Sequence, residues 1–192
     1  MKWIVVTMVG LATAFGVIGC GGPAQRQSAP PQPAASAALP PRPVELPLGG
    51  VDPCALLTDD QRGKLHLDPG DSSHENFGGP VQGPVCVWTN TPKTPDNEYS
   101  GAAILNHGAE YALGAEALRT VDGFAATTTT SIGSDPNFYC GLLVDVAPGQ
   151  ALNATYDNPA KDYPGMNRQL ACGKAQELAE SMLTTLRAQQ NR

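Results

Sequence analysis

Residues 138–156 read FYCGLLVDVAPGQALNATY and decide the fold class. The run from Phe138 to Val146 is the clearest strand in the chain, and Ala151 to Tyr156 follows it across Pro148-Gly149. Two apolar runs separated by a Pro-Gly turn predict a pair of antiparallel strands. We therefore expect a domain built around a β-sheet that contains this hairpin.

The C-terminal segment predicts a helix that covers this sheet. Apolar side chains recur there at intervals of three and four residues, namely Cys172, Ala175, Leu178, Ala179, Met182, Leu183 and Leu186. That spacing puts them on one face of an α-helix. The face must be buried, and the sheet is the surface that it has to cover.

Three further strands are expected ahead of the hairpin, over 84–89, 101–105 and 121–130. They are rich in β-branched or small apolar residues and are bounded by turn residues. The segment 68–80 is predicted to be a loop, and 109–119 a short helix. The sheet would then have about five antiparallel strands.

The domain is expected to begin with helical turns. Asp52 before Pro53 places a capping residue before a proline at the first helical position. Thr58 and Gln61 form a capping-box pattern that starts a helix running to about Leu65. The order of helices, strands and a closing helix predicts an α+β fold, with N- and C-terminal helices covering the antiparallel sheet.

Four cysteines are expected to brace this domain: Cys54, Cys86, Cys140 and Cys172. An even number of cysteines indicates two disulfides, with three possible pairings, when the protein is exported, as its first twenty residues predict. We favour Cys54–Cys86 and Cys140–Cys172, because each of these ties a terminal helix to a strand. The cysteines are dispersed and form no C-x-x-C motif, so we expect neither a metal site nor a redox pair.

The first twenty residues predict an export signal. A short basic start is followed by the uncharged stretch 4–18, which is shorter than the roughly twenty apolar residues of a membrane span. Residues 17–20, Val-Ile-Gly-Cys, resemble the lipobox of bacterial lipoproteins. That resemblance implies removal of a signal peptide over 1–19 and attachment of diacylglycerol to Cys20, usually with N-acylation such as palmitate. A plain secretory cleavage that leaves Cys20 as a thiol is the alternative.

A tether is expected between the anchor and the domain. Residues 21–50 contain eight Pro and six Ala but only three charged residues. Proline fixes φ and removes backbone donors, so this composition favours an extended, semi-rigid linker. We expect the tether to cover 20–50, beginning at the lipidated cysteine, and the globular domain to cover 51–192.

The charge balance excludes two classes of partner. The chain has 12 basic and 18 acidic residues, and residues 51–192 alone have 9 and 17. A protein that binds nucleic acid usually has a positively charged surface patch, and binding to anionic lipid through surface charge requires a cluster of basic residues. We therefore expect no nucleic-acid partner, and contact with a membrane through the lipid on Cys20.

No catalytic, metal or cofactor signature is found, and no P-loop, G-x-G-x-x-G or G-x-S-x-G motif occurs. His107 and Glu110 form one isolated pair that we expect at the surface. Four potential ligands lie within nine residues, in or just before the predicted loop, without the helical spacing of a zinc site, so no metal is expected there: His66, Asp68, Asp71 and His74.

Aromatic residues supply the remaining candidates. Most of them are expected in the core, although one or two could instead line a ligand groove between helix and sheet: Trp88, Phe124, Phe138 and Tyr139. The triplet 153–155, Asn-Ala-Thr, fits a glycosylation sequon, which a bacterial lipoprotein would not normally use.

The cysteines and short motifs together resemble a known family. Residues 52–58 (DPCALLT), Cys86-x-Trp88, Cys140 in an apolar strand and Cys172 at the start of a helix are similar to the actinobacterial lipoproteins grouped as domain of unknown function 3558. The likeness covers most of 51–190. More distantly, the chain resembles mycobacterial lipoproteins with a PsbP-like fold and sensor domains of receptor kinases. The resemblance implies a lipid-anchored protein of the cell envelope and assigns no catalytic residue.

These observations predict a non-catalytic binding or interaction module at the outer face of the membrane. Its partner would be an envelope protein or a small lipid or glycan, and no cofactor is expected. One alternative is an envelope hydrolase whose site is assembled from dispersed histidine and acidic side chains. Another is an extracellular sensor that acts with a membrane protein.

Overall fold

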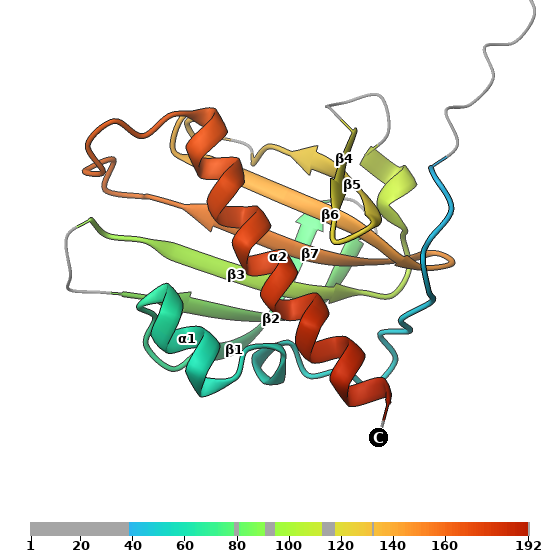
Figure 1. Ribbon diagram of the computed structural model, residues 1–192. Helices are drawn as coiled ribbons and strands as arrows, with labels where there is room; N and C mark the ends of the chain where they lie inside the picture. Colours follow the sequence, from blue (N-terminus) through green and yellow to red (C-terminus); the bar gives the residue numbers. More distant parts are fainter. Residues whose placement is uncertain (1–38, 79–80, 91–94, 113–117, 132, 192) are drawn as a thin grey trace, which may run out of the picture. The chain divides into compact units, whose positions relative to one another are not determined.

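The computed structural model describes residues 39–191, apart from 79–80, 91–94, 113–117 and 132. An antiparallel sheet of seven strands carries a long helix across one face (Figure 1). The strand order is β1-β2-β3-β7-β6-β5-β4. The strands are β1 (Asp71–Gly78), β2 (Val81–Thr89), β3 (Glu98–Ile104), β4 (Leu118–Val121), β5 (Phe124–Thr129), β6 (Tyr139–Ala147) and β7 (Gln150–Asp157). The helices are η1 (Pro53–Leu56), α1 (Asp59–Leu65), η2 (Ala109–Ala112) and α2 (Arg168–Gln190).

The predicted hairpin, β6 and β7, lies at the centre of the sheet. The two strands pair with each other and are flanked by β5 and β3. Leu142 lies opposite Ala154, and Val144 lies opposite Leu152. All four side chains are fully buried, so this face of the hairpin forms the floor of the core. The α+β fold class is therefore confirmed.

The sheet has seven strands where about five were predicted, and β1 is one reason. It lies within 68–80, which was expected to be a loop. β1 pairs with β2 along one edge of the sheet, and its side chains from Asp71 to Asn76 are exposed. Backbone hydrogen bonds hold such a strand, so no apolar alternation marks it in the sequence.

A hairpin over 118–129 is the other reason. Asp122 and Gly123 have φ values of 49° and 85°, the left-handed conformation that a two-residue hairpin turn requires. The strand expected over 121–130 therefore begins only at Phe124, as β5, and the turn pairs it with an additional strand, β4, that precedes it. The segment 109–119 was expected to be a short helix; its described residues form the 3-10 turn η2 and the first residues of β4, and 113–117 lie outside the described residues.

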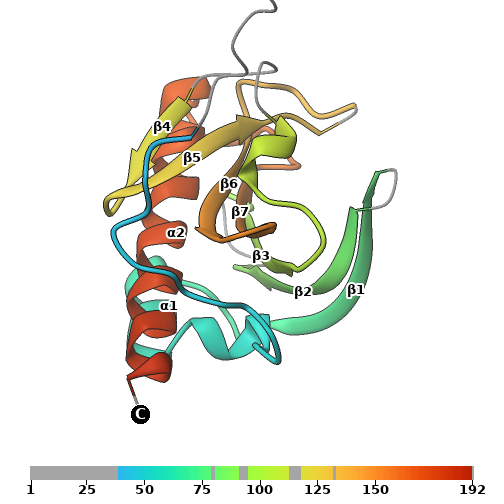
Figure 2. The same cartoon turned by 90° about the vertical axis from the view of Figure 1, so that its right-hand side faces the viewer.

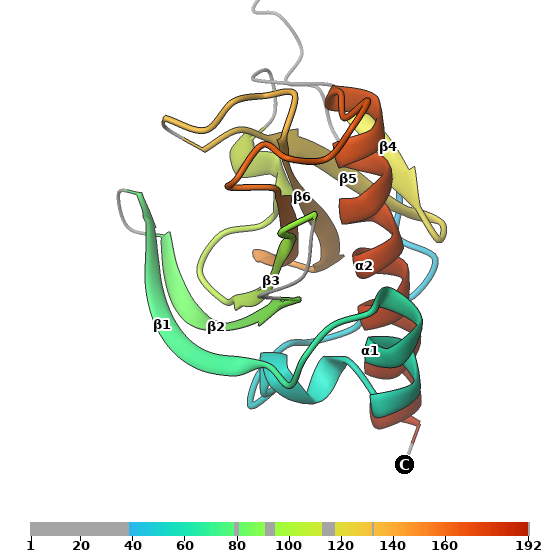
Figure 3. The same cartoon turned by 90° about the vertical axis from the view of Figure 1, so that its left-hand side faces the viewer.

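The helix α2 covers the sheet with the apolar stripe that its sequence predicts. All seven stripe residues are buried, together with Ala171. They meet Trp88, Phe124 and Tyr156, the largest fully buried side chains of the sheet. Figures 2 and 3 show α2 on one side of the sheet and the turn η2 on the other. The main core thus lies between α2 and the sheet.

The N-terminal helical turns begin where their caps predict. The Asp52 carboxylate accepts a hydrogen bond from the backbone N–H of Cys54 at 2.9 Å. Thr58 and Gln61 complete the capping box of α1. The Gln61 amide also donates to the backbone carbonyl of Ser181 at 2.9 Å, which joins α1 to α2.

The segment 39–50, which was expected in the tether, packs against the domain, and we call it the strap. Leu46 and Leu48 are buried in the main core. The backbone N–H of Leu46 donates to the carbonyl of Val146 at 2.8 Å, and that of Leu48 donates to the Gln150 side chain at 2.7 Å. Leu46 and Leu48, which flank Pro47, pack into the edge of the main core although the strap forms no strand of its own. The globular domain of the structure thus includes residues that precede 51.

Candidate functional site

The face of the sheet opposite α2 carries small and hydroxylated side chains over its central strands. Ser100, Thr155, Gly141 and Thr129 lie side by side in register across β3, β7, β6 and β5. Alternate residues of a strand point to opposite faces, so this row points away from the main core. Its serine and threonines are half-buried.

Tyr139 lies across this row because Gly141 has no side chain. A Cβ atom at Gly141 would collide with the Thr129 hydroxyl and would lie 3.2 Å from the Tyr139 hydroxyl. The Tyr139 hydroxyl forms hydrogen bonds with Thr155 and Thr129, the two residues that flank Gly141 in register. Burial raises the pKa of Tyr139, against the opposing effect of both hydrogen bonds. The phenol is therefore a neutral hydrogen-bonding group at neutral pH.

An amide extends the row of hydroxyls along β7. Asn153 is 6% exposed and accepts a hydrogen bond from the Thr155 hydroxyl at 3.1 Å. Asn153 was noted in the sequence as part of a sequon, yet it lies in a central strand of the sheet. We call the set Ser100, Thr129, Tyr139, Asn153 and Thr155 the hydroxyl face.

Two carboxylates lie at one end of the hydroxyl face. Glu98 and Asp157 are directly opposite each other on β3 and β7. Burial raises the pKa of Glu98, and the neighbouring charge of Asp157 raises it further. Burial also raises the pKa of Asp157. Two like charges opposite each other in a sheet are unfavourable, so this end attracts a cationic or hydrogen-bond-donating group.

The aromatic candidates from the sequence fall into two groups. Trp88 and Phe124 are fully buried in the main core and line no groove between helix and sheet. Phe138 and Tyr139 are half-buried at the start of β6. Tyr139 belongs to the hydroxyl face, which is on the side of the sheet opposite the one considered from the sequence.

The histidine and acidic candidates are not brought together. His66 ends α1 in the left-handed conformation, whereas Asp71 and His74 lie on opposite faces of β1. His107 lies against Tyr111, with ring centroids 4.8 Å apart, and its predicted neighbour Glu110 is exposed in η2. Asp68 donates its backbone N–H to the carbonyl of Thr89. Among the described residues, no group of three His, Cys, Asp or Glu is arranged to hold a metal ion.

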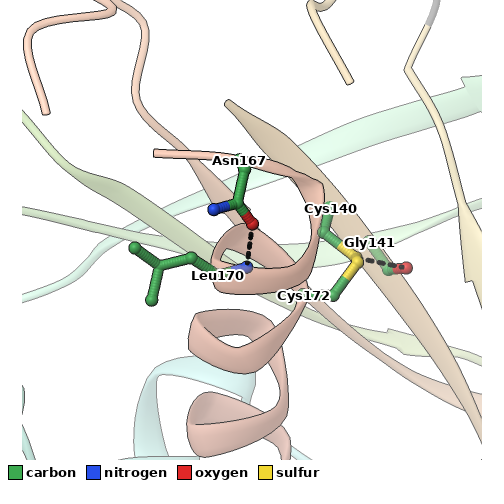
Figure 4. The surroundings of a disulfide bond; sticks show 5 residues. All are labelled: Cys140, Gly141, Asn167, Leu170 and Cys172. Atoms are coloured by element: carbon green, nitrogen blue, oxygen red, sulfur yellow. Dashed lines mark hydrogen bonds between the residues drawn. A yellow bond between two sulfur atoms is a disulfide. The ribbon is translucent and has the colours of Figure 1, made fainter. Parts of the chain in front are cut away.

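Both disulfides have the pairing that the sequence analysis favours. Cys54–Cys86 joins η1 to β2, and Cys140–Cys172 joins β6 to the first turns of α2, with Cα atoms 5.0 Å and 4.9 Å apart. Figure 4 shows the second bridge beside the cap of α2, where Asn167 accepts a hydrogen bond from the backbone of Leu170. The bridges fix the helical layer on one face and leave the hydroxyl face on the other.

Two polar clusters had no signal in the sequence. Arg42 of the strap binds Asp145 of β6, a pairing that no local pattern reveals. At the other end of the sheet, the amide of the fully buried Asn158 donates to Asp162 at 2.8 Å and to the carbonyl of Asp96 at 2.6 Å. The second cluster satisfies buried polar groups where the loop after β7 crosses the β2–β3 connection, so we regard it as structural.

Cys20 and the lipobox lie outside the described residues. In the part of the chain that the structure describes, no helix combines the length and the apolar character of a membrane span.

The comparisons with known proteins give one match. A family described as Protein of unknown function (DUF3558) matches residues 15–185. No curated protein and no solved structure matches the chain.

Proposed function

Because the chain belongs to the DUF3558 family, which has no known function, we propose one from its residues: a lipid-anchored envelope protein that binds a polar ligand on its hydroxyl face without catalysis. The protein would be anchored at the outer face of the membrane. We further propose an actinobacterial origin, on the strength of the motifs around the four bridged cysteines. A relationship to PsbP-like lipoproteins rests on those motifs alone.

The number and pairing of the cysteines support lipid anchoring through Cys20. The chain has five cysteines, and four of them form the two disulfides. The fifth is Cys20, which directly follows the apolar stretch of the export signal. A single unpaired cysteine in an exported protein calls for an explanation, and thioether attachment of diacylglycerol at a lipobox provides one.

The main support for a binding role is the arrangement of polar groups on the hydroxyl face. It presents three hydroxylated side chains and an amide on the rigid central strands of the sheet, with the phenol of Tyr139 held across them. Rigid strands hold polar groups at defined spacings, which is what recognition of a ligand requires. Hydroxyl and amide groups match the hydroxyls of a glycan or the polar part of a lipid, so we propose a ligand of this chemistry from the envelope.

The contacts of the histidines favour binding over hydrolysis. A hydrolase of the serine type needs a histidine within hydrogen-bond distance of a nucleophile and an acid that orients it. Among the described residues, His66 is exposed at the end of α1, His74 is exposed in β1, and His107 contacts the ring of Tyr111. His66→Ala, His74→Ala and His107→Ala test the alternative, because loss of a turnover activity in any of them would establish an enzyme.

Native mass spectrometry tests the binding role. The lipid-free protein is exposed to envelope extract, and the mass excess that denaturation removes is measured. Thr155→Val deletes a hydroxyl of the hydroxyl face and should abolish the mass excess. Thr184→Val is the matched control, because the Thr184 hydroxyl donates to a carbonyl of α2 on the other side of the sheet. Equal ligand retention by both variants would refute the hydroxyl face as the site.

Fractionation tests the anchor separately. Cys20→Ala should move the protein out of the membrane fraction, and the mass of the wild-type protein should include the acyl chains. A Cys20→Ala variant that stays with the membrane would refute lipid anchoring and leave the ligand experiment unaffected.

A further inference from the structure

The two disulfides differ in their access to solvent. Cys140 and Cys172, which join β6 to α2, are both fully buried. Cys86 is also fully buried, whereas its partner Cys54 is partly exposed in the turn η1, next to the exposed Ala55. A thiol opens a disulfide by attacking one of its sulfurs directly, so access to a sulfur decides which bridge reacts. The Cys54–Cys86 bridge is therefore the one open to attack, and the attack falls on Cys54.

A buried hydrogen-bond donor without a partner lies beside Cys86. The indole N–H of Trp88 is fully buried, and no described residue accepts a hydrogen bond from it. A Cβ atom at Gly70 would collide with both the Trp88 indole nitrogen and the Cys86 sulfur, so these two atoms lie next to each other over Gly70. A buried donor that stays unpaired costs free energy, and its position beside a sulfur points to a role in the chemistry of that sulfur.

The Trp88 N–H gains an acceptor when the bridge opens. In the intact disulfide the Cys86 sulfur is only a weak acceptor. When an external thiolate attacks Cys54, the Cys86 sulfur leaves as a thiolate, which is charged and accepts hydrogen bonds more strongly. The neighbouring Trp88 N–H can then donate to this thiolate. A leaving thiolate that is stabilised in this way makes cleavage of the disulfide faster and more favourable.

We propose that Cys54–Cys86 is a reducible bridge that exchanges with an external dithiol through attack at Cys54. The first thiolate of the reductant forms a sulfur–sulfur bond with Cys54 while the Cys54–Cys86 bond breaks, and the Cys86 thiolate leaves beside the Trp88 N–H. The second thiol of the reductant then displaces Cys54. The dithiol is thereby oxidised to a disulfide, and two electrons reduce both cysteines. No C-x-x-C motif marks this pair in the sequence, where we expected no redox pair, because its unequal burial and its indole neighbour arise only in the fold.

Opening this bridge removes the covalent link between η1 and β2. The helix α1, which follows η1, has no buried residue and is held to α2 by hydrogen bonds of Gln61 with Ser181 and Thr185. Segments with few buried side chains open locally at low cost in free energy. Reduction should therefore speed amide hydrogen exchange over 53–65 and leave the exchange of the central strands unchanged.

Reduction of the folded protein tests this proposal. The lipid-free protein with Cys20→Ala keeps only the four bridged cysteines. It is exposed to dithiothreitol without denaturant, alkylated at intervals and mapped by mass spectrometry. The cysteines of the Cys54–Cys86 bridge should be alkylated faster than those of the bridge between β6 and α2, by about tenfold or more. Equal rates at the two bridges, or no reduction of Cys54–Cys86 in the folded protein, would overturn the proposal.

The site of attack is tested with glutathione, a monothiol that forms a mixed disulfide. At early times the glutathione adduct should be found on Cys54, with Cys86 as the free thiol. An adduct on Cys86 would overturn the proposed direction of attack.

Trp88→Phe tests the contribution of the indole N–H. Its loss should lower the rate of Cys54–Cys86 reduction relative to that of Cys140–Cys172 about tenfold. The second bridge in the same molecules is the control, because a general loosening of the core would speed the reduction of both bridges. An unchanged ratio of the two rates would overturn the role of Trp88. These measurements involve neither the hydroxyl face nor a lipid on Cys20, so they are independent of the tests of the proposed function.

Discussion

Arg42 binds Asp145 through two contacts, although the residues are 103 positions apart in the chain. Arg42 Nη2 donates to Asp145 Oδ1 at 3.0 Å, and Nε lies 2.8 Å from Oδ2. The Asp145 side chain is only 2% exposed, so the strap supplies the charge that a buried carboxylate needs. The strap is thus joined to β6, a central strand of the sheet, by a specific ion pair.

Arg42→Ala should destabilise the domain by about 2–4 kcal/mol, because it leaves a buried carboxylate without its partner. Urea unfolding followed by circular dichroism measures the change. Arg62→Ala is the control, since its partner Asp59 is 96% exposed, and its effect should stay below about 1 kcal/mol. Equal losses in the two variants would show that the strap pair contributes no more than a surface ion pair.

The carboxylates beside the hydroxyl face predict a pH dependence with a definite sign. Burial and Asp157 raise the pKa of Glu98 in the folded protein. A raised pKa means that the folded state holds its proton more tightly, so stability from this group is lost as the pH rises through the folded-state pKa. Glu98→Gln should therefore stabilise the domain at pH 7 and make little difference at pH 3.

Thermal unfolding of Glu98→Gln at both pH values tests this expectation. Glu180→Gln, at an exposed position of α2, is the matched control and should shift the unfolding midpoint little at either pH. A Glu98→Gln variant that is less stable than wild type at pH 7 would mean that the carboxylate makes a favourable contact, contrary to the prediction.

Gly141→Ala should destabilise the domain by about 1–3 kcal/mol and disturb the hydroxyl face. The new methyl group would collide with the Thr129 hydroxyl and push against Tyr139. Gly173→Ala in α2 is the control, because its methyl group would meet no atom within 4 Å. That change should stabilise the helix by about 0.5–1 kcal/mol. Chemical unfolding measures the change in the free energy of unfolding for both variants. A change of the same sign in the two variants would contradict the prediction.

Loss of the bridge between β6 and α2 should cost about 2–5 kcal/mol, the usual range for a native disulfide in a small domain. The variant with Cys140→Ser and Cys172→Ser removes this bridge, and unfolding in urea measures the loss of stability.

Peptide mapping without reductant should recover the linked peptides Cys54–Cys86 and Cys140–Cys172 from the wild type. A crossed linkage would contradict the pairing seen in the structure.

Local patterns in the sequence predict the parts of the fold that they govern. The apolar alternation of 138–156 and the stripe of α2 are set by burial on known faces, and the caps at Asp52 and Thr58 are set by adjacent residues. The edge strand β1 escapes prediction because its side chains stay in water and its stability comes from pairing with β2. Such pairing depends on the partner strand and leaves no mark in the segment itself.

The hydroxyl face was only partly foreseeable. Its strands were predicted, and Tyr139 was named as a candidate, but the side of the sheet was not. Only the register of β5, β6 and β7 brings Thr129 and Thr155 to the two sides of Gly141. The strap escaped prediction for a similar reason, since its proline-rich composition hides two leucines that meet their partners about one hundred residues later.

The strand order has a consequence for how the chain acquires its structure when it emerges N-terminus first. β1, β2 and β3 form one unit in order, but β3 completes its pairing only with β7, the last strand. The strap must likewise wait for β6 and β7, because its hydrogen-bond partners are Val146 and Gln150. The Cys54–Cys86 bridge can form before the second half of the chain has emerged, whereas the Cys140–Cys172 bridge can form only after nearly the whole chain has emerged. The strap, which precedes every strand in the chain, is therefore among the last of the described segments to become ordered.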